Sequence, residues 1–251
     1  MEDSSWERAR AAVLGRSGRP DGIGSLAEKT VHAVLKQYLE PDERYREVPV
    51  EHFVADICRP DGIVEIQSAG FYALNRKLAA FLPNYPVTVV YPAVVRKQLI
   101  WVNPDTGELS APRRSPKRNG SYDALRELYS IRSWLQHPSL TIRIMLLEVE
   151  EYKLLNGYGE ARKIRASRYD RIPLRIEGEI VLNSARDYRQ FLPEELPEPF
   201  TMAQWQKATR LSAKMAPRAL QVLRDLGLVY HSGMEGRRYL FRRTENGGRS
   251  I

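Results

Sequence analysis

The sequence predicts a mixed α/β protein, in which a sheet is layered with helices and followed by a small basic module. Helical and strand patterns alternate through the first 150 residues, as they do in a sheet covered by helices. The segment VTVVYPAVV is a continuous apolar run, which is typical of a strand buried on both faces. Beyond residue 152 the chain becomes basic and is interrupted by Gly and Pro, so a second module is expected there.

The first half supplies the elements of the predicted sheet. Residues 1–20 look like a weakly ordered lead-in, and Ser25 with Glu28 forms a capping box for a helix at 25–39. Apolar spacing then predicts the other elements. The helices are expected at 72–82 and 122–136, and the strands at 45–50, 53–58, 62–68, 87–95 and 140–149, with a separate strand and turn in LIWVNPDTGEL.

The second half divides into a connecting segment and a compact module. Residues 153–199 are expected to be a basic linker with connecting elements, between domains at 1–152 and 200–251. In the module, Thr201 caps a short helix and Gly227 ends a longer one. The expected elements are a linker or exposed hairpin at 157–171, helices at 184–191, 202–209 and up to 226, and strands at 228–231 and 238–242.

The formal net charge of +8 is unevenly distributed. Residues 1–150 hold 20 Lys and Arg against 19 Asp and Glu, whereas residues 151–251 hold 19 against 12. This asymmetry indicates an acidic polymer as partner, with a chance surface excess as the alternative. No apolar run approaches the ~18 residues of a membrane span, and the N-terminus lacks a signal-peptide hydrophobic region. Since Cys58 is the one cysteine, no intrachain disulfide is expected, and we predict a cytoplasmic protein without a membrane partner.

Two carboxylates in the segment FVADICRPDGIVEIQS carry the strongest functional signal. The segment predicts two short strands joined by a Pro-Asp-Gly turn, with Asp56 on the first and Glu65 on the second. Gln67 lies two residues beyond Glu65 and therefore points to the same face. Uncompensated charge is costly in a buried strand, and neighbouring carboxylates repel each other unless a hard cation lies between them. These residues indicate a divalent metal site, most simply for Mg²⁺.

The order of these acids and elements resembles a nuclease superfamily. Glu28 on a helix, Asp56 on a strand and Glu65-Ile66-Gln67 on the next strand look like the PD-(D/E)XK pattern, which restriction endonucleases and Holliday-junction resolvases share. The resemblance covers about residues 25–91 and includes the order of helices and strands. It implies a restriction-endonuclease-like fold, with a mixed sheet flanked by helices.

The resemblance also implies a catalytic role for each of these residues. Asp56 and Glu65, with the main-chain carbonyl of Ile66, would bind Mg²⁺, or Mn²⁺ in its place, and Glu28 would bind directly or through water. Such an ion offsets negative charge at the phosphorus and lowers the pKa of a bound water. Gln67 would complete the catalytic set by a hydrogen bond to that water.

Gln67 departs from the family pattern, which usually has Lys at this position. Glutamine supplies no charge, and a basic residue of the following helix, Arg76 or Lys77, could supply it instead. Ordinary structural roles remain open as well: Glu28 could cap its helix, Asp56 could pair with Arg59, and Gln67 could face solvent. Glu65 is harder to explain in this way, because apolar residues surround it in the sequence.

The segment FTMAQWQKATRLSAKMAPRALQVLRDLGLVYHSGMEGRRYLFRR resembles a winged helix-turn-helix over about 45 residues. Its longer helix would bury Ala216, Leu220, Leu223 and Leu226. Side chains on the other side would read a major groove, namely Lys214, Arg218, Gln221 and Arg224. The hairpin would contact phosphate through Arg237, Arg238, Arg242 and Arg243. Winged helices also serve as protein-interaction modules, which is the alternative.

Together these expectations predict a Mg²⁺-dependent deoxyribonuclease whose basic module holds DNA, double-stranded in preference to single-stranded. Nucleases of this type often pair two active sites, so a homodimer is compatible with the prediction. Two alternatives stay open. One is a DNA-binding or regulatory protein that retains an inactive nuclease fold, which Gln67 favours. The other is a protein-interaction scaffold that uses neither site.

Overall fold

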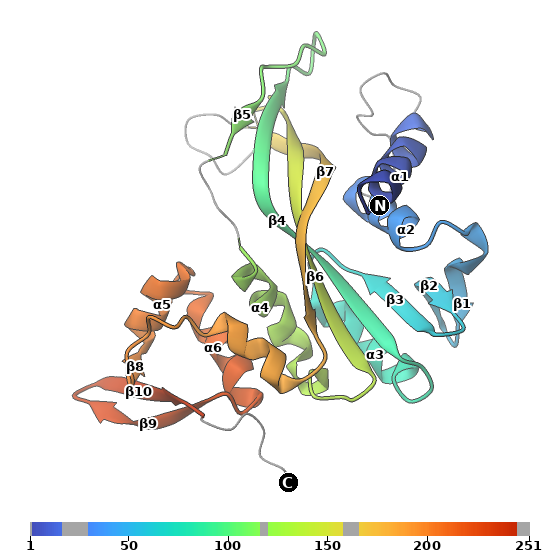
Figure 1. Cartoon of the computed structure of the whole chain (residues 1–251). Coiled ribbons are helices and arrows are strands. Elements are labelled where there is room, and N and C mark those ends of the chain that lie inside the picture. Colours follow the sequence, from blue (N-terminus) through green and yellow to red (C-terminus); the bar gives the residue numbers. More distant parts are fainter. Residues whose placement is uncertain (1, 17–29, 116–119, 158–165, 245–251) are drawn as a thin grey trace.

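The protein is a mixed α/β fold built on one large sheet. The computed structural model describes residues 2–16, 30–115, 120–157 and 166–244. Seven strands form the sheet in the order β1-β2-β3-β4-β6-β7, with β5 paired to β4 (Figure 1). Their bounds are β1 Arg46–Val50, β2 Phe53–Arg59, β3 Gly62–Ile66, β4 Val87–Val102, β5 Arg113–Arg114, β6 Leu140–Leu154 and β7 Ser167–Leu182. Strands β3, β4 and β6 are parallel and the other pairs are antiparallel, so the predicted mixed sheet is confirmed.

Helices cover both faces of the sheet, as predicted. One face carries α1 (Glu2–Arg16) and α2 (Thr30–Leu39), and the other carries α3 (Leu74–Phe81) and α4 (Tyr122–Leu128). Val34 and Leu35 of α2 belong to one apolar cluster, while Leu78 and Phe81 of α3 belong to a second. Short 3₁₀ helices complete these layers, at η1 Glu43–Tyr45, η2 Phe71–Ala73 and η3 Tyr129–Trp134. Strand β3 is consequently buried along its whole length.

The N-terminal segment differs from its prediction. Residues 2–16 form helix α1, although a weakly ordered lead-in was expected. Trp6 is 2% exposed and its ring meets Tyr38 of α2 edge to face at 5.2 Å. The Trp6 indole also donates a hydrogen bond to the Leu174 carbonyl, 2.9 Å away. A narrow stripe of Trp6, Ala9 and Val13 is thus enough to dock a helix that is otherwise polar.

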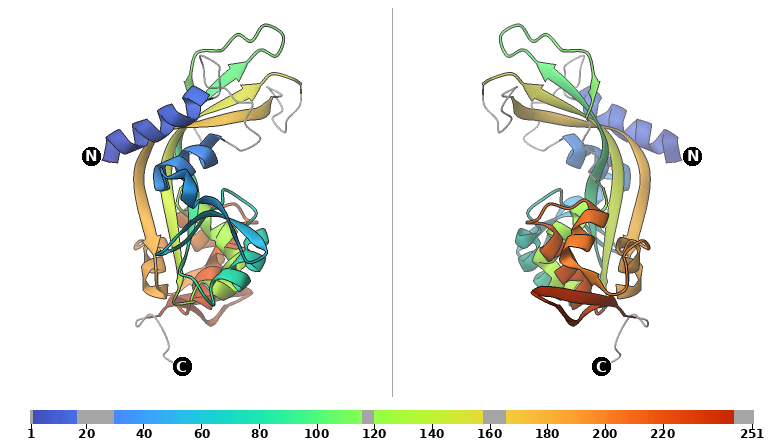
Figure 2. Two further views of the ribbon diagram at one scale, coloured as in Figure 1. Left: turned by 90° about the vertical axis from the view of Figure 1, so that its right-hand side faces the viewer. Right: turned by 90° about the vertical axis from the view of Figure 1, so that its left-hand side faces the viewer.

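The strands β4, β6 and β7 are longer than predicted. Strand β4 pairs with β6 from Val87↔Leu140 to Val102↔Leu154, so the two strands expected at 87–95 and 99–102 are one. Strand β7 pairs with β6 over the same length and belongs to the sheet. The assignment of 153–199 to a linker is therefore wrong for β7. Charged residues recur along this strand, so its sequence does not indicate that its main chain is hydrogen-bonded in the sheet. Figures 1 and 2 show these strands extending well past α3 and α4, with α1 beside their far part.

The C-terminal module has the predicted order of elements. The 3₁₀ helix η4 (Ala185–Phe191) precedes it, and the module contains β8 (Phe200–Thr201), α5 (Met202–Thr209), α6 (Ala216–Asp225), β9 (Val229–Glu235) and β10 (Arg238–Arg243). A capping box of Thr201 and Gln204 begins α5, and Gly227 follows α6 with a φ of +71°. The three strands form a second sheet in the order β8-β10-β9.

This module packs directly against the large sheet's helices. The ring of Tyr122, which begins α4, lies 5.9 Å from Phe191 and 6.4 Å from Trp205. Arg132 in η3 and Asp225 at the end of α6 form an ion pair of 3.1 Å. One apolar cluster therefore runs from the sheet into the module. In the part of the chain described, none of the helices is long and apolar enough to cross a membrane.

Candidate functional site

The two predicted carboxylates lie where β2 and β3 separate. These strands pair antiparallel from Arg59↔Gly62 to Ile57↔Val64, and the next residue on each strand is Asp56 or Glu65. The main-chain N–H of Asp56 approaches Glu65 Oε1 at 3.4 Å, so the two acids are immediate neighbours. The structure thus brings together two of the acids that the sequence singled out.

Gly62 fixes the start of the strand that carries Glu65. Its φ of +140° suits glycine, and a Cβ there would lie 2.6 Å from the Pro86 carbonyl oxygen. The same oxygen accepts a hydrogen bond from Ile63 N at 2.9 Å. The close approach at Gly62 therefore sets the register in which Glu65 lies opposite Val89 of β4.

Asp56 is held by groups from a helix and a strand. Its Oδ2 accepts a hydrogen bond from Ile66 N at 2.7 Å and lies 3.2 Å from His32 Nε2 on α2. Burial tends to raise the pKa of Asp56, but His32, the Ile66 amide and Lys77 together lower it below its usual range. Asp56 is therefore an ionised carboxylate at neutral pH. It does not pair with Arg59, whose partners are Asp61 and Glu40.

Glu65 is the most deeply buried acid of the site, at 2% exposed. Lys77 on α3 donates hydrogen bonds from Nζ to Glu65 Oε2 and to the Val54 carbonyl, each at 2.7 Å. Burial and the neighbouring Asp56 nevertheless raise the pKa of Glu65 to about 7. Both protonation states of Glu65 are therefore populated near pH 7, and a further cation nearby would favour the ionised form.

Lys77, rather than Arg76, is the basic residue that reaches the acid pair. Arg76 instead lies over the ring of Phe53, 5.8 Å from its centroid. The start of the segment that carries Lys77 is anchored by buried Glu127, whose Oε2 accepts a hydrogen bond from Gly70 N at 2.8 Å. Lys77 therefore reaches into the site from a helix whose preceding segment is anchored at Gly70.

The other predicted members of the set are placed differently. Gln67 is half-buried, and its amide donates a hydrogen bond to the Ala69 carbonyl at 2.5 Å. Ile66 brings its main chain beside Asp56, as its N–H contact shows. Glu28 and Ser25 lie outside the described residues. Among the residues that are described, no group of three or more His, Cys, Asp and Glu side chains is arranged to hold a metal ion.

His32 is a site residue that the sequence did not single out. It lies one helical turn beyond Glu28, and residues four apart on a helix share a face. That spacing was the available signal, because a helix that presents Glu28 to the site would present His32 as well.

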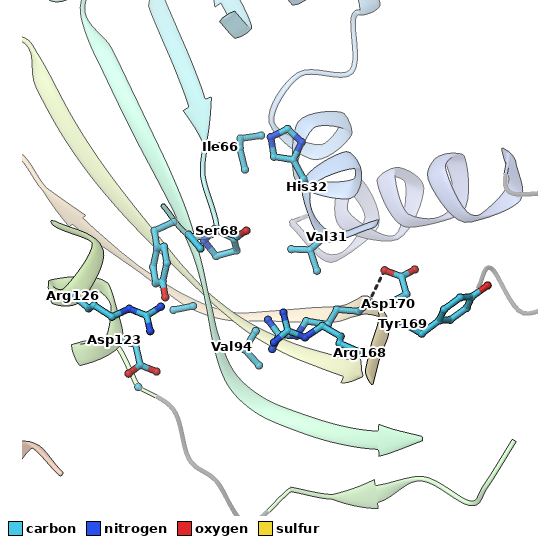
Figure 3. A pocket seen from close by; sticks show the side chains of 16 residues that line it. Val31, His32, Ile66, Ser68, Val94, Asp123, Arg126, Arg168, Tyr169 and Asp170 are labelled. Atoms are coloured by element: carbon cyan, nitrogen blue, oxygen red, sulfur yellow. Dashed lines mark hydrogen bonds between the residues drawn. The ribbon is translucent and has the colours of Figure 1, made fainter. Parts of the chain in front are cut away.

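A pocket of about 710 Å³ opens next to the acid pair. Val31 and His32 of α2 and Ile66 of β3 line it together with β4, α4 and β7. Three arginines also line it, namely Arg126, Arg168 and Arg171. Figure 3 shows Arg126 and Arg168 on opposite sides of the pocket, while His32 and Ile66 lie on a third side. The sequence placed Arg168 and Arg171 in a linker, so this pocket was not expected.

The predicted groove-reading side chains lie on α6 and just before it. Lys214, Arg218 and Arg224 are exposed and Gln221 is half-buried, while the four apolar residues expected beneath them are buried. Arg218 lies 5.8 Å from the ring centroid of Tyr129 in η3. Gln221 donates to Asp225 at 2.6 Å and accepts from Arg224 at 3.2 Å. The basic surface of α6 therefore borders the large domain.

The predicted phosphate contacts of the hairpin are mostly exposed. Arg237, Arg238 and Arg242 are all exposed at β10 or in the turn before it. Arg243 instead pairs with Glu198 at 2.8 Å and donates to the carbonyls of Pro193 and Leu196. Its guanidinium therefore ties β10 to the preceding segment, and the expected contact of Arg243 with phosphate stays a prediction.

The family and the relative that match this chain are both described without an activity. Residues 29–183 match the model of a family described as a domain of unknown function, DUF8091. This range contains the acid pair, Lys77 and the pocket arginines. An uncharacterized protein of Treponema pallidum (strain Nichols) is 30% identical over 227 residues, which are 90% of this chain and 89% of that relative. No solved structure matches the chain significantly.

Proposed function

Since the chain belongs to the DUF8091 family, whose description names no activity, we propose a function from its own residues. We propose a metal-dependent endonuclease that cleaves DNA phosphodiester bonds, with a C-terminal winged-helix module that holds the DNA. The observation that carries this proposal is the meeting of Asp56 and Glu65 at diverging strands with Lys77 beside them. The proposal thus rests on one site in the large sheet.

The order and pairing of the elements support the finer fold assignment. Helix α2, three antiparallel strands, helix α3 and the parallel strand β4 follow one another as in a restriction-endonuclease-like core. In the module, two helices precede a β-hairpin that pairs with the short strand β8, as in a winged helix. These are likenesses of topology, and function follows from the site.

The donor atoms at the site fit a hard divalent cation. Asp56, Glu65 and the main-chain carbonyl of Ile66 are oxygen donors, which Mg²⁺ and Mn²⁺ prefer. We propose that these three groups, with Glu28, hold the ion. A bound ion would offset charge on the scissile phosphate and lower the pKa of a water. Because the pKa of Glu65 is raised to about 7, a bound ion would favour its ionised form.

Nearby side chains have distinct proposed roles. Lys77 supplies the positive charge that Gln67 lacks, from a position 2.7 Å from Glu65. His32 orients Asp56 through the contact between Nε2 and Oδ2. Gln67 lies at the end of the same strand with its amide bound to Ala69, so its proposed part is to shape the loop that follows. Lys77 is therefore the residue we assign in place of the family lysine.

A second candidate is a DNA-binding protein with an inactive nuclease fold. The observation that favours it is the pairing of each acid with its own basic residue, Asp56 with His32 and Glu65 with Lys77. These partners satisfy the acids without an ion. The two candidates share the C-terminal module and differ only in whether the acid pair performs chemistry.

Plasmid nicking separates the two candidates. Wild type, Asp56→Ala and Asp61→Ala are compared with Mg²⁺ or Mn²⁺ and with EDTA. Asp61 is a matched control, because it lies in the β2–β3 turn and is 73% exposed. We expect Asp56→Ala to lower the metal-dependent rate about 100-fold or more, as the loss of a charge-stabilising group does, and Asp61→Ala to leave it unchanged. Equal rates in all three proteins, or none in any, would remove the catalytic proposal.

A further inference from the structure

The pocket beside the acid pair carries more positive than negative charge. Buried Glu151, 2% exposed, is approached by Arg171 at 2.7 Å and by Arg168 at 3.7 Å. Lys97 and Lys153 approach the same carboxylate at 3.3 and 3.7 Å. One carboxylate therefore faces four cations, and two of these cations line the pocket.

The acids that line the pocket do not cancel this excess. Asp170 accepts a hydrogen bond from the Thr30 hydroxyl at 2.5 Å and another from Arg171 N at 2.7 Å, so it is engaged locally. Asp123 is the other acid of the lining, so three arginines face two carboxylates there. Across the pocket, Arg126 uses Nε and one terminal nitrogen on Glu127. A guanidinium has five N–H donors, so Arg126 retains others for a ligand.

The crowding of guanidinium groups favours an anionic ligand. Arg168 exposes about half of its side chain, and desolvation of the rest together with its neighbour Arg171 lowers its pKa. An anion placed between Arg126 and Arg168 would relieve this repulsion, and guanidinium groups bind phosphate through paired N–H donors. The volume of about 710 Å³ lies within the range of pockets that hold small organic ligands.

We propose that this pocket binds a nucleotide unit by its phosphate, with Arg126, Arg168 and Arg171 as the phosphate-binding residues. The inference deepens the proposed function and rests on it for the placement of that nucleotide in a nucleic-acid strand. His32 lines the pocket and lies 3.2 Å from Asp56. A strand whose phosphate occupies the pocket would therefore pass beside the acid pair.

The test compares two arginines of the same strand. Arg168 and Arg175 both lie on β7 and both side chains are 56% exposed, but Arg175 pairs with Glu148 and Glu177 and does not line the pocket. Fluorescence anisotropy of a labelled single strand of about 12 nucleotides is measured in EDTA at two salt concentrations. Arg126→Gln serves as a second pocket variant from a different element, and thermal melts check that each variant folds.

We expect Arg168→Gln and Arg126→Gln each to weaken strand binding about tenfold, as the loss of a hydrogen bond to a charged group does. Each should also reduce the salt slope by about 0.7 per lost phosphate contact. Arg175→Gln should bind like wild type. Equal affinity of folded Arg168→Gln, Arg126→Gln and Arg175→Gln would overturn the proposal.

Competition identifies the source of the phosphate. Displacement of the strand by dAMP from wild type at concentrations near the strand's own Kd would assign a free nucleotide to the pocket, whereas displacement only by unlabelled strand would assign a strand. Both results support a nucleotide phosphate when Arg168→Gln abolishes them. Because binding is measured in EDTA, a pocket that binds while nicking is absent would leave this inference standing and remove only the nuclease. If wild type nicks DNA and the pocket variants bind the strand as wild type does, this inference is overturned and the nuclease proposal stands.

Discussion

The acid pair and the C-terminal basic surface hold their charges in opposite ways. Glu65 is 2% exposed and lies 2.7 Å from Lys77, so its ionisation depends on one neighbour. Arg237 and Arg238 are exposed on a hairpin, where water solvates them. Buried charges interact strongly with few partners, whereas exposed charges act through a shared field that salt screens. A single replacement should therefore alter the acid pair sharply and the basic surface gradually.

The two regions share their packing, because one apolar cluster extends beneath both of them. Trp205 of α5 is fully buried, and its indole donates to the Ala216 carbonyl at 3.1 Å. The same cluster contains Ile63 of β3, two residues before Glu65. The two regions therefore differ in electrostatics but share an apolar core, and the electrostatics and the core can be tested separately.

The largest expected effect concerns this common packing. Trp205→Ala should reduce the free energy of unfolding by about 3–5 kcal/mol, because it removes a buried aromatic side chain and leaves a cavity. Tyr230→Ala, on an exposed residue, is the control. Chemical denaturation followed by circular dichroism and by tryptophan fluorescence should give coincident transitions. Two separate transitions, with only one shifted, would show that the regions fold independently.

The next effect concerns the pH dependence of stability. The pKa of Glu65 is raised by folding to about 7, so the folded state binds a proton more tightly than the unfolded chain does. Stability from this group is present below pH 4.5 and is lost as the pH rises toward about 7. Glu65→Gln should remove this loss, which amounts to roughly 2–3 kcal/mol between pH 5 and 8.

The Glu65→Gln measurement is made in EDTA by urea denaturation across that pH range. Asp61→Asn is the control, since Asp61 is exposed in the adjacent turn. Wild type and Asp61→Asn should show the same decline, and Glu65→Gln a flatter curve. Parallel curves for all three proteins would mean that Glu65 titrates normally and that the buried acid is not distinct from a surface one.

The smallest effect per residue is expected on the basic hairpin. Replacing Arg237, Arg238 and Arg242 by Gln should weaken duplex binding by about tenfold at moderate salt and reduce the salt slope by about 0.9 per contact. Gel shifts at low and moderate salt check this. Arg175→Gln, which removes one positive charge from the large sheet, is the control for each single replacement. A loss of binding that does not depend on salt, or no binding by wild type at low salt, would contradict a role in phosphate contact.

Much of the fold follows from local sequence signals. The turn at Pro60, Asp61 and Gly62 and the cap at Thr201 predicted the β2–β3 hairpin and helix α5 near their observed bounds. Helix α1 and strand β7 were missed because their order comes from tertiary contacts. Trp6 reaches Leu174, 168 positions along the chain, and no local pattern indicates that contact. The predicted helix at 122–136 is instead α4 followed by 3₁₀ helix η3, with non-helical angles at Ile131.

The site was predictable to a similar extent. The juxtaposition of Asp56 and Glu65 follows from the hairpin, because they are equally distant from its turn. Lys77 was one of two options, and only the packing of α3 distinguishes it from Arg76. Arg126 and Arg168 come together from α4 and β7, and a basic stretch of sequence does not reveal which pocket its side chains line.

The ion pair between Arg132 and Asp225 and the ring of Tyr122 against Trp205 join the module to the large domain. If both regions bind one duplex, these contacts set the distance along the DNA between the bound base pairs and the cleaved phosphodiester bond. Breaks would then fall at a constant offset from the bound sequence, and end-mapping of the products would display a single spacing.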